Sequence, residues 1–325
     1  MEQSIARRLP VAPSLPASSR LMQLEGIHHL TAVTADAPGN HAFYTGTLGL
    51  RLVKKTVNQD DTSVYHLFYA DGLASPGTDI TFFDFETKRE RRGTRSVVRT
   101  GFRVKDRASL DYWKARLAEA GVTVGEIVSR DGRDTLDFED PEGQRLMLVV
   151  DETGAPGNPW ARSPVPAEHQ ILGLGPIVMS VPDLSPTKAV LTALMLMKPL
   201  REYELDGCRV HVFGMGKPGP LGELHVAVEP HLDRTHPGAG GVHHVAFAVP
   251  DADYEAWAER LRTTAMPNSG PVDRYWFRSL YFREPGGVLF ELATNGPGFA
   301  TDEPMETLGE TLSLPPFLEG RRAAI

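Results

Sequence analysis

Two pairs of adjacent histidines and one glutamate are the residues of this sequence best suited to metal chemistry. The pairs are His28-His29 and His243-His244, and the carboxylate is Glu291. Two imidazoles and one carboxylate form a triad that binds iron(II) on one face and leaves positions open for substrate and oxygen. A single histidine in a strand is more often a buried polar residue without such a role. The two pairs together with the carboxylate favour a metal site.

Strand alternation indicates which histidine of each pair is the ligand. Alternate residues of a strand share a face. His244 shares its face with Ala246 and Ala248, which leave room for a cavity, whereas His243 shares its face with bulky apolar residues. In the first pair, His29 runs with Thr31. We therefore predict that the second histidine of each pair binds the metal, and leave open whether the first is catalytic or structural.

Four similar segments must position these residues. Each opens with a strand-like run and an aspartate placed to cap a helix, and continues with about three more strand-like runs. The aspartates are Asp36, Asp106, Asp183 and Asp251. The units span approximately 24–87, 95–151, 171–229 and 240–294. Because the ligands come from units one and four, we expect these two units to close around one metal-site barrel, which leaves units two and three to pair with each other. A swapped arrangement between two chains would satisfy the distances as well.

The pattern predicts an α+β fold of four βαβββ modules, arranged as two curved mixed-sheet half-barrel domains. We place modules one and two in a domain over 24–151 and modules three and four in a domain over 171–296. The proline-rich stretch 152–170 is typical of a linker. The remaining segments are predicted to be a flexible N-terminal extension over 1–23 and a C-terminal tail or lid over 297–325.

Composition limits the class of protein. The 325 residues are 41% hydrophobic and 23% charged, which is typical of a globular protein. The net charge of −8 argues against binding to nucleic acid, and no apolar run is long enough to span a membrane. The single cysteine, Cys208, excludes an internal disulfide framework. We expect a cytoplasmic protein that acts on a small molecule. Whether it forms a homo-oligomer stays open.

The four-module organisation resembles the vicinal oxygen chelate superfamily of glyoxalase, bleomycin-resistance and extradiol dioxygenase proteins. Three stretches are further similar to the hydroquinone ring-cleaving dioxygenases, the family that includes dichlorohydroquinone dioxygenase. These stretches are residues 26–31, 241–245 and 270–291. The resemblance covers about 24–300, nearly the whole chain. It implies O2-dependent opening of a substituted para-hydroquinone at Fe(II), and Mn(II) suits the same ligands.

The resemblance also implies roles for individual residues. It gives the metal ligands as His29, His244 and Glu291. The positions implied to face the substrate or to support the ligands are His28, Thr31, His243, Arg274 and Tyr281. Simpler readings stay open for three of them: Arg274 could pair with Asp273, Tyr281 could be a core aromatic, and Thr31 could lack a role.

Two other functions on the same fold are alternatives. A glyoxalase-type isomerase or lyase typically takes a carboxylate from each of two paired units, and counting from the aligned prolines places Phe82 at that position of unit one. A non-catalytic small-molecule binding protein would generally lack metal ligands. A catechol-cleaving enzyme would use units three and four, where Pro176 cannot bind a metal. His225, near the end of unit three, is a weaker rival ligand.

Overall fold

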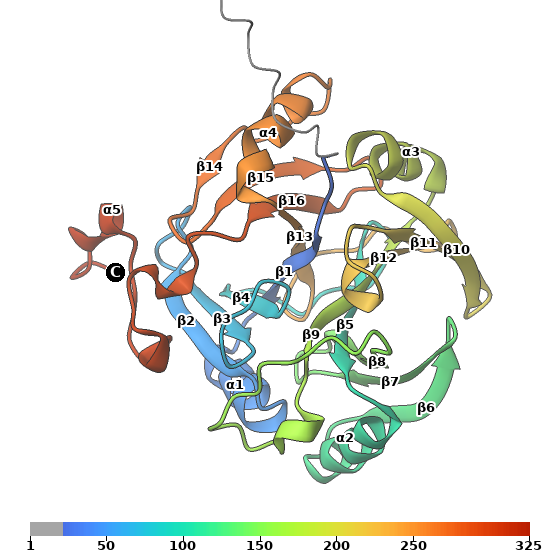
Figure 1. The fold of residues 1–325 in the computed structure, drawn as a ribbon, viewed down its shortest axis with the longest axis horizontal. Helices are drawn as coiled ribbons and strands as arrows, with labels where there is room; N and C mark the ends of the chain where they lie inside the picture. Colours follow the sequence, from blue (N-terminus) through green and yellow to red (C-terminus); the bar gives the residue numbers. More distant parts are fainter. Residues whose placement is uncertain (1–21) are drawn as a thin grey trace, which may run out of the picture.

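The computed structural model describes residues 22–325, so nearly all of the predicted extension over 1–23 lies outside the described residues. The chain forms two eight-stranded sheets that curve side by side, with the helices on the outside (Figure 1). The α+β fold of two curved mixed-sheet half-barrels predicted from the sequence is confirmed.

The first sheet joins strands of units one and four in the order β14-β15-β16-β13-β1-β4-β3-β2. Unit one contributes β1 (Gly26–Thr34), β2 (Arg51–Val57), β3 (Tyr65–Ala70) and β4 (Asp79–Asp84). Unit four contributes β13 (Val242–Val249), β14 (Val272–Asp273), β15 (Arg278–Arg283) and β16 (Leu289–Thr294). The antiparallel pair β1–β13 is the seam between the two units.

The second sheet joins strands of units two and three in the order β10-β11-β12-β9-β5-β8-β7-β6. Unit two contributes β5 (Ser96–Val104), β6 (Val124–Arg130), β7 (Arg133–Glu139) and β8 (Arg145–Val150). Unit three contributes β9 (Gly173–Val181), β10 (Lys198–Leu205), β11 (Cys208–Gly214) and β12 (Glu223–Val228). Each sheet therefore draws strands from both halves of the chain, and the division into domains over 24–151 and 171–296 stays a prediction.

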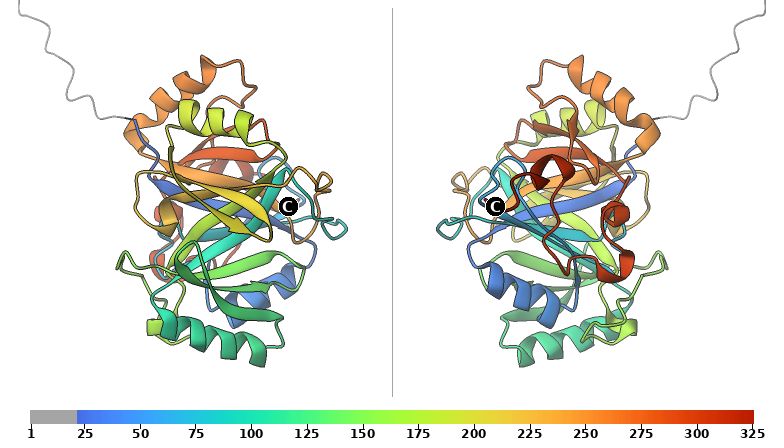
Figure 2. Two further views of the ribbon diagram at one scale, coloured as in Figure 1. Left: turned by 90° about the vertical axis from the view of Figure 1, so that its right-hand side faces the viewer. Right: turned by 90° about the vertical axis from the view of Figure 1, so that its left-hand side faces the viewer.

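Each unit carries one helix after its first strand, and these helices lie at two opposite ends of the molecule (Figure 2). They are α1 (Ala37–His41), α2 (Arg107–Glu119), α3 (Leu184–Ala189) and α4 (Tyr254–Arg262). Helices α1 and α3 continue as π-helical turns over Ala42–Thr47 and Val190–Leu194.

The predicted aspartate caps are present in three of the four units. The side chains of Asp36, Asp106 and Asp183 each accept a hydrogen bond from a backbone N–H in the first turn of their helix. The prediction for Asp251 is wrong. A short 3₁₀ turn over Asp251–Asp253 separates the strand from α4, and no side chain caps that helix.

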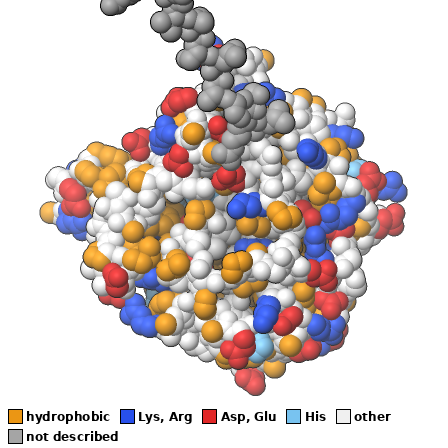
Figure 3. All heavy atoms as spheres, viewed as in Figure 1, with side chains coloured by type: hydrophobic (Ala, Val, Ile, Leu, Met, Phe, Trp, Pro, Cys, Tyr) orange, Lys and Arg blue, Asp and Glu red, His pale blue; other side chains and the backbone are white. Residues whose placement is uncertain are grey.

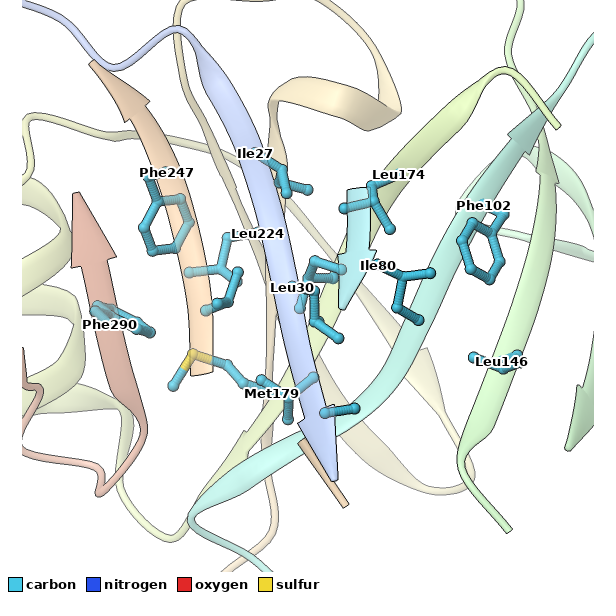
Figure 4. Packing of buried hydrophobic residues seen from close by; sticks show 14 of the residues in the cluster. Ile27, Leu30, Ile80, Phe102, Leu146, Leu174, Met179, Leu224, Phe247 and Phe290 are labelled. Atoms are coloured by element: carbon cyan, nitrogen blue, oxygen red, sulfur yellow. The ribbon is translucent and has the colours of Figure 1, made fainter. Parts of the chain in front are cut away.

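One hydrophobic core connects the two sheets. Figure 4 shows side chains from both sheets in this cluster, among them Leu30 of β1, Phe247 of β13 and Leu174 of β9. On β1 the core residues are Ile27, Leu30 and Ala32, a spacing that departs from strict alternation between the first two. The alternate residues of the first sheet that do not enter this core point to the concave side, where the candidate ligands lie.

The C-terminal segment after β16 packs against unit one (Figure 1). The ammonium group of Lys54 on β2 is fully buried and binds the carboxylates of Asp302 and Glu303. Further along, Leu314 and Leu318 of the segment containing α5 (Pro316–Glu319) pack on Val57. Residues 297–325 are thus fastened to β2, and their action as a lid stays a prediction.

The surface shows no large area of one charge on the face seen in Figure 3, where acidic and basic side chains alternate around the rim. None of the helices within residues 22–325 is both long and apolar enough to cross a lipid bilayer.

Candidate metal centre

Three neighbouring strands of the first sheet bring the predicted ligands together. His29 lies on β1, His244 on β13 and Glu291 on β16, and all three are buried. The Oε2 atom of Glu291 is 3.1 Å from Nε2 of His29 and 2.9 Å from Nε2 of His244. The two Nε2 atoms are 3.3 Å apart. The three donor atoms therefore form a small, nearly regular triangle.

This triangle has the dimensions of a metal-binding face. Ligands at 2.0–2.2 Å from an ion and at right angles to one another are separated by about 2.8 to 3.1 Å. Despite its short contacts, Glu291 Oε2 is a buried atom that no hydrogen bond satisfies. A buried carboxylate oxygen without a hydrogen bond is costly unless a cation neutralises it. The donor set therefore fits a divalent ion.

The first histidine of each pair holds the second. His28 Nδ1 is 2.8 Å from His29 Nδ1, and His243 Nδ1 is 2.8 Å from His244 Nδ1. If the second histidine donates its Nδ1–H in this contact, its Nε2 carries the lone pair that a metal requires. The identical contact in both pairs indicates that His28 and His243 fix the orientation and tautomer of their neighbours.

Two β-bulges make these contacts possible. The register between β1 and β13 shifts between Ile27 and His29, and again opposite His243, so His28 and His243 are the extra residues. A bulge redirects side chains that alternation would send to the opposite face. His28 is consequently buried behind His29, while His243 lies at the more exposed edge of the site.

Burial lowers the pKa of three imidazoles around the centre, those of His28, His243 and His244. Burial, followed by the neighbouring His29, lowers the pKa of His28 to about 3, and burial lowers the pKa of His243 to about 4. Burial also lowers the pKa of His244. Burial alone would raise the pKa of Glu291, but the two adjacent imidazoles outweigh it and hold the pKa well below its usual value. A neutral imidazole and an ionised carboxylate are the forms that bind metals.

Ser279 on β15 orients the carboxylate. Its hydroxyl donates a 2.5 Å hydrogen bond to Oε1 of Glu291, so that Oε2 is the oxygen that faces the histidines. Ser279 and Glu291 are both fully buried, which fixes the carboxylate in one position. Sequence reasoning did not identify this serine.

Arg274 and Tyr281 lie at the same cavity as the ligands. The guanidinium of Arg274 donates to the Tyr281 hydroxyl oxygen at 3.2 Å, and the Tyr281 ring contacts the ring of His244. Burial, with the charge of Glu291, raises the pKa of Tyr281, so its hydroxyl keeps its proton. Arg274 forms its bidentate ion pair with Asp60 of unit one. This contact joins units one and four at the mouth of the cavity.

Thr31 is the start of a hydrogen-bonded row across unit one. Its hydroxyl is 2.8 Å from that of Thr81 on β4, which is 2.9 Å from Nε2 of His66 on β3. Thr31 and Thr81 are both fully buried. Thr31 therefore lies on the concave side with a hydrogen-bonding partner, at the position paired with His244.

The cavity beside the ligands has a volume of about 500 Å³. Its wall is largely aromatic and apolar. The apolar lining residues are Val57, Phe68, Phe83, Val272, Trp276, Phe277 and Leu289. Such a cavity suits a small planar molecule with few polar groups.

The register corrects one position inferred from the sequence. Glu291 pairs with Ala246, two residues after His244, and the equivalent pair in unit one is Thr31 with Thr81. Thr81, and not Phe82, therefore occupies the position of a second carboxylate. The turn before β4 is one residue shorter than the turn before β16. Counting the same number of residues from the aligned prolines therefore reaches one residue too far in unit one. Phe82 instead packs in the core.

A second acidic group lies in the other sheet. Within the described residues, Asp131, Glu223 and His225 also bring ligand atoms close together. Here Arg133 and Arg201 bind Glu223, and Arg201 also binds Asp131. The guanidinium groups already supply the positive charge, so His225 is a poor rival for a metal ligand.

Sequence reasoning missed three residues at the cavity: His66, Phe277 and Asp60. Alternation along Tyr65–Ala70 places His66 with Phe68 on the face opposite the core residues Leu67 and Tyr69, and that signal was available. The ring of Phe277 contacts those of His28 and His29. Both Phe277 and Asp60 lie in irregular segments. No periodicity predicts where such residues point.

Comparison with known proteins gives one consistent family. The family model for the Glyoxalase/Bleomycin resistance protein/Dioxygenase superfamily matches residues 26–148 and 173–292. A Bacillus subtilis protein assigned by name as ring-cleaving dioxygenase MhqA is 46% identical over 94% of this chain and 98% of its own length. Chlorohydroquinone/hydroquinone 1,2-dioxygenase of Sphingobium indicum is 31% identical over 92% of this chain and 94% of its own.

A solved structure agrees. The crystal structure of a protein assigned as a dioxygenase from Bacillus subtilis superposes with a TM-score of 0.86 at 33% identity, over 94% of this chain and 96% of that one. The family resemblance seen in the sequence motifs is confirmed by these matches. The chain belongs to the Glyoxalase/Bleomycin resistance protein/Dioxygenase superfamily.

Proposed function

We propose that this protein is an Fe(II)-dependent dioxygenase that opens the ring of a substituted para-hydroquinone with O2. The observation that carries the proposal is the triangle of His29, His244 and Glu291 beside an aromatic cavity. Relatives over nearly the whole chain bear the names of ring-cleaving and hydroquinone dioxygenases. The absence of a carboxylate at Thr81 disfavours the isomerase, which would draw one from each paired unit.

The metal ligands in this proposal are His29, His244 and Glu291. Three ligands on one face leave the other face for reactants, and an iron(II) ion there would bring a phenolic oxygen and O2 together. Mn(II) suits the same nitrogen and oxygen donors. His28 and His243 hold the two ligand imidazoles through their Nδ1 atoms, and Ser279 holds the carboxylate.

The remaining residues act on the ring. Tyr281 keeps its proton and can donate a hydrogen bond to an oxygen beside the ligands, while Arg274 supplies a fixed positive charge next to it. Anionic character that develops on the ring oxygen is stabilised by both. Because its Nδ1 accepts from His244, neutral His243 has its proton on Nε2, where at the accessible edge of the site it can donate a hydrogen bond to an oxygen of the substrate. The aromatic wall excludes water around the ring.

The proposal includes a location in the cytoplasm, since a chain with one cysteine does not need an oxidising compartment. A homo-oligomer also stays a prediction.

Anaerobic loading with Fe(II), followed by oxygen uptake with a panel of substituted hydroquinones and catechols, tests the function. We expect uptake with hydroquinones, one iron per chain, and loss of both in His244→Ala and Glu291→Ala. Glu259→Gln, in an exposed ion pair on α4, is the control and keeps full activity. No uptake with any ring, despite one tightly bound iron per chain, would refute the dioxygenase.

A further inference from the structure

His66 lines the cavity on a different part of its wall from the metal ligands. In the sheet, β4 separates β3, which carries His66, from β1, which carries His29. Neighbouring strands are about 4.8 Å apart, so the two strands are separated by about 10 Å along the curved sheet. A molecule bound at the metal ligands therefore faces His66 with the end that points away from those ligands.

The imidazole of His66 is held in one orientation. Its Nε2 is 2.9 Å from the hydroxyl of Thr81, which is in turn 2.8 Å from the hydroxyl of Thr31. Its ring contacts those of Phe68 and Phe83, with centroids 4.0 and 4.3 Å apart. The side chain therefore cannot turn freely to find another partner.

The second nitrogen of this ring is available to a ligand. Within residues 22–325, no group forms a hydrogen bond with Nδ1 of His66, and the side chain is only half-buried. Burial lowers the pKa of His66 well below its usual value, so the ring is neutral and its Nδ1 either accepts or donates one hydrogen bond. A hydroxyl group can satisfy either form.

His66 occupies the position in unit one that Ser279 occupies in unit four. Ser279 on β15 pairs with Ala293, two residues after Glu291, and His66 pairs with Phe83, two residues after Thr81. Ser279 holds the carboxylate of Glu291, whereas His66 is held by Thr81. Unit one thus has a histidine that lines the cavity where unit four has the serine that holds the carboxylate.

We propose that His66 forms a hydrogen bond with the second hydroxyl of the substrate, the one para to the oxygen at the metal, and thereby selects para-hydroquinones. The inference rests on the proposed function. A catechol carries both hydroxyls at the metal end and cannot reach His66, and a ring with one hydroxyl leaves Nδ1 without a partner in an aromatic wall.

Anaerobic binding of hydroquinone and 4-methylphenol to the Fe(II)-loaded protein tests this proposal, because a methyl group there replaces the second hydroxyl. We expect the wild type to bind hydroquinone about 10-fold more tightly than 4-methylphenol, the value of one hydrogen bond. In His66→Phe the two affinities become equal, mainly through weaker binding of hydroquinone. His66→Gln, which keeps a donor and an acceptor, retains part of the preference.

His211→Phe is the matched control, since His211 is a half-buried strand histidine in the other sheet, and it leaves the ratio unchanged. An unchanged ratio in His66→Phe, equal loss for both ligands, or no binding of either ring to the wild type would overturn the proposal. Because binding is measured without oxygen, a protein that binds both rings but never consumes oxygen refutes the dioxygenase while the ratio still decides the role of His66.

Discussion

In the first sheet the buried carboxylate of Glu291 faces two imidazoles, whereas in the second sheet the buried carboxylate of Glu223 faces two guanidinium groups. The sheets share one strand topology, and both clusters include a histidine. A guanidinium is a permanent cation, but a buried imidazole is neutral near pH 7. The second cluster is therefore complete in itself, and the first needs an added cation.

The positions that correspond to the ligands hold other residue types in the second sheet. By register, unit two has Arg99 and Met147 where unit four has His244 and Glu291, and unit three has Pro176 and His225. An arginine and a proline side chain offer no metal ligand, and a methionine thioether is a soft, weak one. The repeat thus preserves the scaffold in four copies, while the candidate metal ligands lie on β1, β13 and β16 of the first sheet.

The largest expected difference is in stability without metal. Glu223→Gln leaves Arg133 and Arg201 in a mostly buried cluster with less negative charge, and we expect the free energy of unfolding to fall by about 3 kcal/mol. The same change at Glu291, which faces no permanent cation, should cost less than about 1 kcal/mol. Denaturant titration of the metal-free variants measures both values.

Adding the metal should stabilise one of these two variants and not the other. Fe(II) under anaerobic conditions is expected to raise the Tm of the wild type and of Glu223→Gln, because both keep the three ligands, and to leave Glu291→Gln unchanged. Equal losses of stability in the two metal-free variants, or a metal-dependent Tm in Glu291→Gln, would contradict the assignment of charges to the two clusters.

The second expected difference is in pH dependence. The pKa of His28 is lowered to about 3 by burial and by His29, whereas Glu223 opposes the effect of burial on His225. The unfolded chain, with an ordinary histidine pKa near 6.5, binds a proton that folded His28 does not. Stability is therefore complete above about pH 6.5 and falls on acidification by roughly 1 kcal/mol per pH unit toward pH 3.

Metal-free His28→Gln should show a flatter acid limb in its free energy of unfolding than the wild type. His41→Gln, which replaces an exposed histidine on α1, is the control and should keep the wild-type slope. A slope that His28→Gln leaves intact would mean that another group carries the acid sensitivity of the folded state.

The sequence predicted the scaffold and the residues of the candidate metal centre because both follow from periodic features. The repeat of the capping aspartates located the four units, and the choice of His29 and His244 followed from alternation. Alternation could not place His28 and His243, because a bulge at each adds one residue and turns it toward its neighbour. A bulge leaves no periodic signal in a single sequence.

Contacts between units were also beyond the sequence. An ion pair of Arg274 with Asp273 was left open, but its partner is Asp60, which lies 214 residues away in another unit. The position of Thr81 was missed because turn length, and not sequence pattern, sets the register of β4. Such features depend on the packed arrangement of the strands.

The smallest expected effect on the free energy of unfolding comes from a comparison of two ion pairs, each of which joins two units. Asp131 of unit two pairs with Arg201 of unit three, and its side chain is 8% exposed. Asp60 of unit one pairs with Arg274 of unit four, and its side chain is 73% exposed. Solvent screens the second pair, so Asp60→Asn should change the free energy of unfolding by less than about 0.5 kcal/mol, whereas Asp131→Asn should cost about 2 kcal/mol.

Asp60→Asn should nevertheless affect the site, because Arg274 loses one of the two groups that hold it beside the cavity. Tyr281 still contacts the guanidinium, so the charge stays near the ligands but is less well fixed. We expect KM for a hydroquinone to rise about threefold with kcat nearly unchanged, and the rise to shrink at high salt as the wild-type pair is itself screened. A tenfold loss of kcat would instead mean that Asp60 acts on the reacting ring, and the ion pair would then belong to the catalytic site and not to the entrance of the cavity.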